Sequence, residues 1–128
     1  MAQDFSDLRV YKESYELGRE IYGLTKGLPK DELYGMVSQM RRAAVSIPLN
    51  IAEGHGRRAS QATFANFVQM AIGSANELLV LLDYAKDFGY AREDRVAGIS
   101  ERYRALLKQL ESLHKRLVNK LDNPRSDI

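Results

Sequence analysis

The sequence contains no cysteine among its 128 residues. This absence excludes a disulfide framework, a thiolate zinc site and a cysteine nucleophile. Long apolar runs are also missing: the N-terminal stretch MAQDFSDLRVYKES has no apolar region of the length that a secretory signal needs. No run approaches the roughly 20 apolar residues of a transmembrane helix. We therefore expect a cytoplasmic protein with no membrane partner.

There is little excess charge of either sign, since 19 Lys and Arg oppose 17 Asp and Glu for a net charge of +2. The halves differ: residues 1–53 hold seven basic and eight acidic residues, and residues 54–128 hold twelve and nine. This distribution permits a basic face in the second half but does not require one.

Four segments of helical periodicity fill the chain, at approximately 6–26, 30–53, 60–88 and 92–121. The breaks between them are the GLP motif at 27–29, the glycines at 54 and 56, and Gly89, and Ser60 is a typical N-cap. Long helices joined by short loops lie antiparallel to their neighbours. The prediction is a single all-α domain, 1–128, folded as an antiparallel up-down-up-down four-helix bundle.

Each segment has an apolar row at spacings of three and four residues. The first has two rows, one of them rich in tyrosine (Leu8, Tyr11, Tyr15, Gly18, Tyr22) and one aliphatic (Val10, Leu17, Ile21, Leu24). The rows expected in the core from the other segments are Leu33, Met36 or Val37, Met40, Ala44, Ile47 and Ile51; Phe64, Phe67, Ala71, Ala75, Leu78, Leu82 and Ala85; and Val96, Ile99, Tyr103, Leu106, Leu110, Leu113, Leu117 and Leu121.

The second segment contains a proline and a polar stripe. Pro48 lacks an N–H and crowds the carbonyl of Ala44, so we expect a kink there. The stripe consists of Gln39, Arg42, Ser46, Asn50 and Glu53, with Ser74 and Glu77 opposite in the third segment. We expect an Arg42–Glu77 ion pair, hydrogen-bonded by Ser46 or Ser74, that fixes the register of the two helices. A ligand site and a subunit contact are the alternatives for these residues.

Val45, Leu49 and Ala52 are apolar but project away from the expected core. They predict a surface for self-association, with Val45 and Leu49 as the contact residues. The alternative is that a broad helix buries more than a narrow stripe.

The segment GHGRRAS at 54–60 is the best candidate for contacting phosphate, because two glycines permit a nest of backbone amides beside Arg57 and Arg58. An ordinary interhelical turn is the alternative. The fourth segment contains further basic residues, among them Arg95, Arg102, Lys108 and Lys115. They could extend the positive surface of Arg57 and Arg58, and the alternative is a solvated face of mixed charge.

Catalytic and metal sites have little support. Glu111 and His114 form one E-x-x-H motif, whereas a di-iron bundle needs two such motifs and two further carboxylates. No histidine accompanies Ser46 or Ser74 as a base. We predict no catalytic residue, no metal and no cofactor.

Three stretches carry a family resemblance: FSDLRVYKESYELGREIY, LPKDELYGMVSQMRRAAVSIPLNIAEG and FANFVQMAIGSANELLVLLDYAKDFGY. They resemble the four-helix bundle proteins of the 23S rRNA intervening-sequence family over nearly the whole chain. The most specific positions are Glu32, Gln39, Arg41, Arg42, Ser46, Asn50, Glu53, Gly54, Gly73, Ser74, Glu77 and Leu78.

The resemblance implies an all-α bundle that assembles as a ring-like homopentamer. It extends to accessory proteins of diversity-generating retroelements, which form basic pentameric barrels that engage nucleic acid and a reverse transcriptase. We therefore expect a non-enzymatic oligomer that binds RNA, DNA or a ribonucleoprotein through a composite basic surface. The alternative is a scaffold for a protein partner with no nucleic-acid role.

Overall fold

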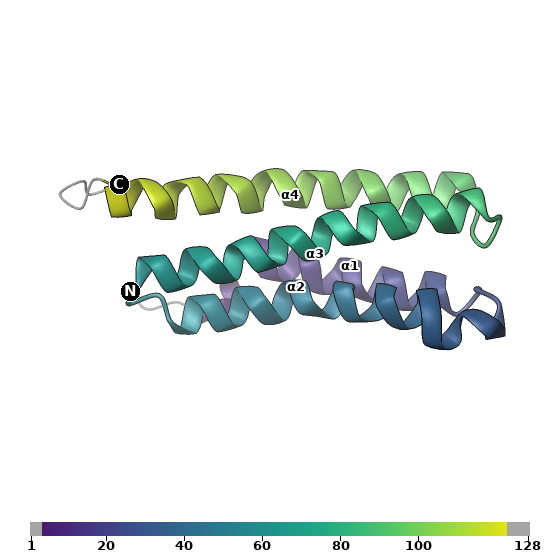
Figure 1. Cartoon of the computed structure of the whole chain (residues 1–128). Coiled ribbons are helices and arrows are strands. Elements are labelled where there is room, and N and C mark those ends of the chain that lie inside the picture. Colours follow the sequence, from purple (N-terminus) through teal and green to yellow (C-terminus); the bar gives the residue numbers. More distant parts are fainter. Residues whose placement is uncertain (1–3, 123–128) are drawn as a thin grey trace.

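The computed structural model describes residues 4–122 and confirms the all-α four-helix bundle. Its long helices are α1 (Arg9–Thr25), α2 (Ser38–Gly56), α3 (Gln61–Asp87) and α4 (Glu93–Asp122), and they run alternately in opposite directions (Figure 1). Three short helical segments complete the described elements: η1 (Phe5–Asp7), η2 (Lys30–Glu32) and η3 (Leu33–Val37).

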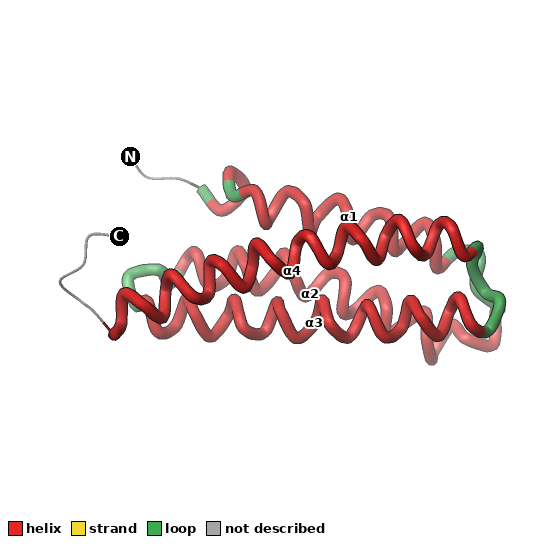
Figure 2. Tube along the Cα trace, turned by 90° about the horizontal axis from the view of Figure 1, so that it is seen from above, coloured by secondary structure: helices red, strands yellow, loops and turns green. Residues whose placement is uncertain are grey.

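The helices pack in cyclic order, each against the next, and α4 closes the bundle onto α1 through the loosest of the four seams. The start of α1, the α2–α3 turn and the end of α4 lie at one end of the bundle (Figure 2). The α1–α2 and α3–α4 connections lie at the other end. Residues far apart in sequence therefore meet at each end.

The aliphatic row of α1 enters the core, whereas its tyrosine row does not. Val10, Leu17, Ile21 and Leu24 are buried, but Tyr15 and Tyr22 are exposed. The apolar row of α4 is buried from Val96 to Leu117 except for half-buried Leu113, and the side chain of Leu121 lies outside the described residues. In α3, Phe67 is only half-buried and the rest of the predicted row is in the core.

Residues 30–37 depart from the predicted helix, which the structure begins only at Ser38. Here the chain forms a 3₁₀ turn and then a π-helical turn in which Gly35 has non-helical angles (φ −110°, ψ −106°). The Glu32 carboxylate holds this segment, accepting hydrogen bonds from the Met36 N–H at 3.3 Å and from the Tyr90 hydroxyl at 3.0 Å. The wider turn rotates Leu33 out of the core, so its predicted burial is wrong: 48% of its surface is exposed.

The predicted end of the second helix at Glu53 is also wrong, because α2 continues through Gly54 to Gly56. Gly54 serves the packing of α2 on α3 rather than helix termination. A Cβ atom at Gly54 would lie 2.8 Å from the Cβ of Phe67 and 2.9 Å from the Cδ1 of Phe64. Only glycine therefore allows this approach.

Pro48 lies inside α2, where the α-helical conformation continues. Since proline has no N–H, the carbonyl of Ala44 is left without its helical donor. This carbonyl faces α1 at Gly18, where a Cβ would lie 3.8 Å from the oxygen. The proline thus coincides with a close approach of α1 and α2.

By length and composition alone, α3 is long and apolar enough to cross a membrane. This differs from the expectation that no segment of the chain has the apolar length of a transmembrane helix. The same property is typical of a central helix in a soluble bundle. Ten residues of α3 are buried, and the helix packs against both α2 and α4.

Candidate nucleic-acid interface

The α2–α3 turn displays Arg57 and Arg58, but both guanidinium groups have partners. The Arg57 Nε donates to Glu53 Oε2 at 2.7 Å, and its guanidinium lies 5.7 Å from the centre of the Phe67 ring. The Arg58 Nη1 donates to the carbonyl of His55 at 2.8 Å, near the end of α2. Both side chains remain exposed, so the turn keeps a positive surface.

The backbone nest that the two glycines permit does not form, and the structure has the alternative, an ordinary interhelical turn. The N–H groups of Arg57, Arg58 and Ser60 donate to the carbonyls of Gly54, His55 and Arg57, respectively. Ser60 is the N-cap of α3, as predicted, and accepts a hydrogen bond from the Thr63 N–H at 3.2 Å. These amides are therefore occupied within the turn, and any phosphate contact here must come from the side chains.

His55 is buried beneath the turn with 7% of its surface exposed, and its ring meets the ring of Phe64 edge-on at 6.2 Å. Burial lowers the pKa of His55, and the nearby Arg58 lowers it further, while Asp4 opposes the change. The imidazole is therefore held in its neutral form and contributes no charge to the basic surface at neutral pH.

Basic residues of α4 concentrate in its C-terminal part. Residues 102–120 contain six Lys and Arg against one acidic residue, Glu111, a difference of +5. Residues 92–101 contain two basic and three acidic residues. All six basic side chains are exposed: Arg102, Arg104, Lys108, Lys115, Arg116 and Lys120. Positive charge therefore increases along α4 toward the end that it shares with the α2–α3 turn.

A groove of about 460 Å³ lies between the start of α1 and this part of α4. Its basic lining residues are Arg9 from α1 and Lys108 and Arg116 from α4, and no acidic residue lines it. These three side chains are exposed and make no ion pair within residues 4–122. Gln109 and Ser112 add hydrogen-bonding groups to the wall. This combination can bind phosphate oxygens by charge and by hydrogen bonds.

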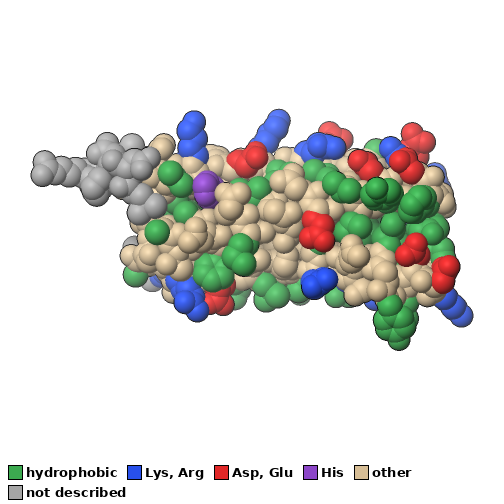
Figure 3. Space-filling view, in the orientation of Figure 1, with side chains coloured by type: hydrophobic (Ala, Val, Ile, Leu, Met, Phe, Trp, Pro, Cys, Tyr) green, Lys and Arg blue, Asp and Glu red, His purple; other side chains and the backbone are tan. Residues whose placement is uncertain are grey.

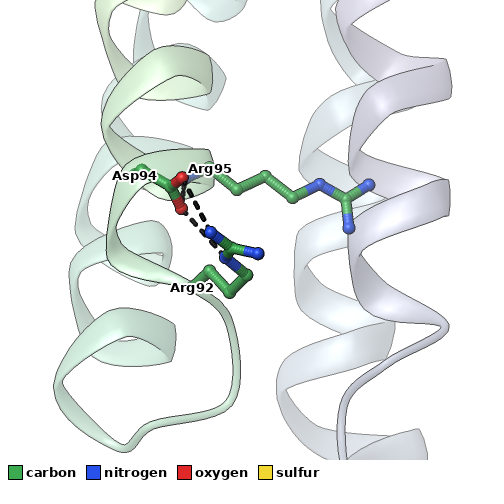
Figure 4. Close-up of polar contacts among 3 residues, drawn as sticks. All are labelled: Arg92, Asp94 and Arg95. Carbon is green, nitrogen blue, oxygen red and sulfur yellow. Dashed lines mark hydrogen bonds and ion pairs between the residues drawn. The ribbon is translucent and has the colours of Figure 1, made fainter.

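The predicted basic residues do not form one surface. Lys108 lines the α1–α4 groove and Lys115 follows it on α4, whereas Arg102 lies nearer the start of α4. Arg57 and Arg58 lie in the α2–α3 turn, at the end of the bundle where α4 ends (Figure 1). Arg95 lies at the opposite end, where its side chain extends from α4 toward α1 (Figure 4). Its Nη2 lies only 3.3 Å from the position that a Cβ of Gly23 would occupy. Arg95 therefore belongs to the α1–α4 contact and lies away from the basic end.

Arg9 was not among the predicted residues. It lies about a hundred positions from Lys108 in sequence, and only the antiparallel pairing of α1 with α4 brings the two together. Periodicity places each residue on its own helix, but it does not give the register between the first and last helices.

The polar stripe of α2 forms a smaller network than predicted. The Ser46 and Ser74 hydroxyls are 2.5 Å apart, and Asn50 Nδ2 donates to the Ser46 carbonyl at 2.8 Å. The expected Arg42–Glu77 ion pair does not form within residues 4–122, and both side chains are exposed. Gln39 is also exposed, and Glu53 pairs instead with Arg57.

The model of the 23S rRNA-intervening sequence protein family matches residues 6–112. The chain belongs to this family. A similar solved structure is that of a protein with unknown function from the S23 ribosomal protein family of Bacteroides thetaiotaomicron VPI-5482. The two are 28% identical, the match covers 83% of this chain and 95% of that chain, and the TM-score is 0.75. No curated protein matches the chain.

The match to the 23S rRNA-intervening sequence protein family covers most, but not all, of the predicted basic residues. Arg57, Arg58, Arg102 and Lys108 lie within the matched residues. Lys115 and Arg116 lie beyond residue 112, where the family match ends. The complete α1–α4 groove therefore combines matched residues with residues outside the match.

Proposed function

We propose that this member of the family is a non-enzymatic protein that binds structured RNA or duplex DNA through the basic end of the bundle. The observation that carries the proposal is the α1–α4 groove, where Arg9, Lys108 and Arg116 converge without an acidic lining residue. Phosphate contacts supply most of the sequence-independent affinity of proteins for nucleic acids. The Arg57–Arg58 turn lies at the same end and extends the surface.

Two features favour shape and phosphate recognition over base reading. No tyrosine or phenylalanine lines the basic groove, so it offers no ring on which a base could stack. Its charges are flexible side chains rather than a rigid network. The resemblance to retroelement accessory proteins that engage nucleic acid is in line with this mode of binding.

A binding role also fits the hydroxyl groups that could otherwise act as nucleophiles. Ser46 and Ser74 hydrogen-bond to each other, and the buried His55 lies at the α2–α3 turn beside Arg58 and Phe64. Neither serine thus has the adjacent base that nucleophilic catalysis uses.

Fluorescence anisotropy with a labelled RNA hairpin and a labelled DNA duplex, each over a salt series, tests the proposal. The Lys108→Ala/Arg116→Ala variant should bind more weakly, and its slope of log affinity against log salt should fall by about 0.9 for each lost contact with duplex DNA. The matched control, Lys30→Ala/Arg92→Ala, removes the same two residue types from the opposite end and should bind like wild type. Equal losses in both variants, or no binding by wild type at about 50 mM salt, would contradict the proposal.

A protein-interaction scaffold is the second candidate function. It is favoured by a different observation, an apolar groove between α1 and α2 that leaves Val45 and Leu49 exposed. Binding of wild type to neither nucleic acid in the salt series would favour this role.

A further inference from the structure

Two sets of exposed hydrophobic side chains lie on the surface of the bundle. One set gathers around the end of α3, on the face that Figure 3 shows. The other set lines a groove of about 570 Å³ between α1 and α2, which we call the α1–α2 groove. This volume lies within the range of small-molecule pockets in proteins. The α1–α2 groove is therefore a candidate site for a small ligand.

Aromatic and aliphatic side chains form the walls of the α1–α2 groove. Tyr11, Tyr15 and Tyr22 lie along α1, and Val45 and Leu49 lie along α2. From the first to the last of these tyrosines the wall extends over about 16 Å of helix. Because both walls are helical, their backbone groups are largely hydrogen-bonded within α1 and α2. A peptide in this groove would leave its own amide groups without protein partners, whereas an acyl or aryl group has none to satisfy.

The α1–α2 groove continues, toward the start of α2, into a second depression of about 440 Å³. Tyr22, Val45 and Leu49 line both of them, so the two are continuous. Arg41 and Arg42 line the second depression only. No acidic side chain among residues 4–122 lines either one. An apolar groove that leads to two arginines has the form of a site for an amphiphilic anion.

The side chain of Arg41 is held in place by the end of α1. Its guanidinium lies 4.7 Å from the centre of the Tyr22 ring, and its Nε donates to Thr25 Oγ1 at 2.9 Å. The Thr25 hydroxyl itself donates to the carbonyl of Ile21 at 2.8 Å. Within the described part of the chain, the two Nη groups of Arg41 donate to no other residue. The planar guanidinium therefore keeps donors that match the two oxygens of a carboxylate.

Further positive charge lies beside Arg41. Arg42 lines the second depression and Lys26 lines the α1–α2 groove, and both side chains are exposed. Neither of them forms an ion pair within residues 4–122, and the same holds for Arg41. Arg19, which also lines the groove, differs because it pairs with Glu16 at 3.2 Å. Three cations without partners are thus gathered near one end of an apolar groove, where they attract an anionic group.

We propose that the α1–α2 groove binds a small amphiphilic carboxylate, with its acyl or aryl body between the two helices and its carboxylate on Arg41. Arg42 and Lys26 add to the attraction of the carboxylate. The proposal does not rest on nucleic-acid binding, since no residue of the α1–α4 groove takes part. Val45 and Leu49 are the residues predicted to mediate self-association, so a bound carboxylate would compete with a second copy for this surface.

Calorimetric titration with ligands that share one alkyl chain tests the proposal, each ligand being kept below its micelle concentration. Decanoate, decanol and decylamine differ only in the charge of the head group, and butyrate has the carboxylate without the long chain. Wild type should bind decanoate at least about tenfold more tightly than decanol, because only the carboxylate can accept charge-assisted hydrogen bonds from Arg41. Decylamine and butyrate should bind more weakly than decanoate. Equal affinities for decanoate and decanol, or no binding of decanoate up to about 1 mM, would overturn the proposal.

Variants of the two arginines separate recognition of the head group from recognition of the chain. Arg41→Gln/Arg42→Gln should weaken decanoate binding by about tenfold or more and leave decanol binding unchanged, which also shows that the groove is intact. Arg42→Gln alone alters an exposed side chain and should give a smaller loss. If the double variant binds neither ligand, this single variant decides, and an undiminished affinity for decanoate in it would overturn the proposal.

The matched control is Lys108→Ala/Arg116→Ala, which removes two cations from the α1–α4 groove and should bind decanoate like wild type. An equal loss in this variant and in the arginine double variant would show that decanoate responds to positive charge in general, and would overturn the proposal. Because the same control variant is the one expected to lose nucleic-acid binding, failure of either proposal is distinguishable from failure of the other.

Discussion

The hydroxyl oxygens of Ser46 and Ser74 lie 2.5 Å apart and join α2 to α3 near the middle of both helices. Ser46 also donates to the Ala43 carbonyl at 2.9 Å, so the pair is anchored to the backbone of α2. A small neutral pair thus occupies the place where a buried ion pair was expected, and it avoids the cost of desolvating two charges.

We predict that Ser46 and Ser74 stabilise the fold together. Each Ser→Ala change should lower the free energy of unfolding by about 1 kcal/mol, and the double variant should lose less than the sum. Urea unfolding of the four members of this cycle measures the coupling. Ser38→Ala, an exposed position on the same helix, should change stability by less than about 0.5 kcal/mol. Additive losses would show that the two hydroxyls act independently.

Tyr103 presents the opposite situation, a buried hydroxyl without a hydrogen-bond partner among the described residues. Burial also raises the pKa of its phenol, so the group stays neutral. Tyr103→Phe removes the unsatisfied oxygen and retains the ring. We expect unchanged stability or a gain of up to about 1 kcal/mol in thermal unfolding. A loss of more than about 1 kcal/mol would mean that the hydroxyl has a partner after all.

Gly54→Ala should destabilise the protein by about 1–3 kcal/mol, because the new methyl group would overlap the side chains of Phe64 and Phe67. Gly98→Ala is the matched control. Gly98 lies in α4, where a methyl group in place of its hydrogen would have nothing within 4 Å, so alanine should stabilise the helix by up to about 1 kcal/mol. Opposite shifts of the two melting temperatures are expected, and a tolerated Gly54→Ala would argue against the tight α2–α3 packing.

His55 should make stability depend on pH. Its pKa is lowered in the folded state, so the unfolded chain binds the proton more readily. The contribution is fully present above the unfolded pKa of about 6.5 and is lost as the pH falls below it. Melting temperatures between pH 7.5 and 5.5 should decline for wild type and decline less for His55→Gln. His114→Gln retains His55 and should keep the wild-type decline. An identical decline for His55→Gln would exclude this residue as the cause.

Glu53→Gln should raise the affinity for nucleic acid, if the α2–α3 turn joins the basic groove in binding. The change removes the carboxylate that accepts the Arg57 hydrogen bond at 2.7 Å and so increases the net positive charge of the turn. Anisotropy at two salt concentrations should show tighter binding with a steeper salt dependence. Glu93→Gln, at the opposite end of the bundle, adds the same charge and should have a smaller effect. Equal effects would place the bound nucleic acid away from the turn.

Local patterns in the sequence were enough to predict the helices of the bundle. The Ser60 cap, the GLP break and Gly89 with its positive φ of 75° place the ends of α1 and α3 and the start of α4 to within a few residues of the prediction. The beginning of α2 could not be found in this way. It depends on Glu32, whose carboxylate meets the hydroxyl of Tyr90, 58 positions later in the chain.

The candidate site was less accessible to sequence reasoning than the fold. Residue type and helical position identified Lys108 as a surface cation, but the groove exists only because Arg9 lies opposite on α1. The Arg42–Glu77 prediction was wrong because helical spacing shows which residues share a stripe and does not show whether water will separate them. The groove and the missing ion pair both depend on distances between helices. The periodicity of apolar and polar residues along one helix gives no information about these distances.

The unequal distribution of charge along α4 gives the molecule a permanent electric dipole along its long axis. Its positive pole is the end that holds the basic groove and the α2–α3 turn, whereas basic and acidic groups are balanced at the other end. A polyanion would orient such a rod before the two surfaces touch, over the distance of about 10 Å within which salt leaves charges unscreened. Such a rod would therefore meet a polyanion with this end first.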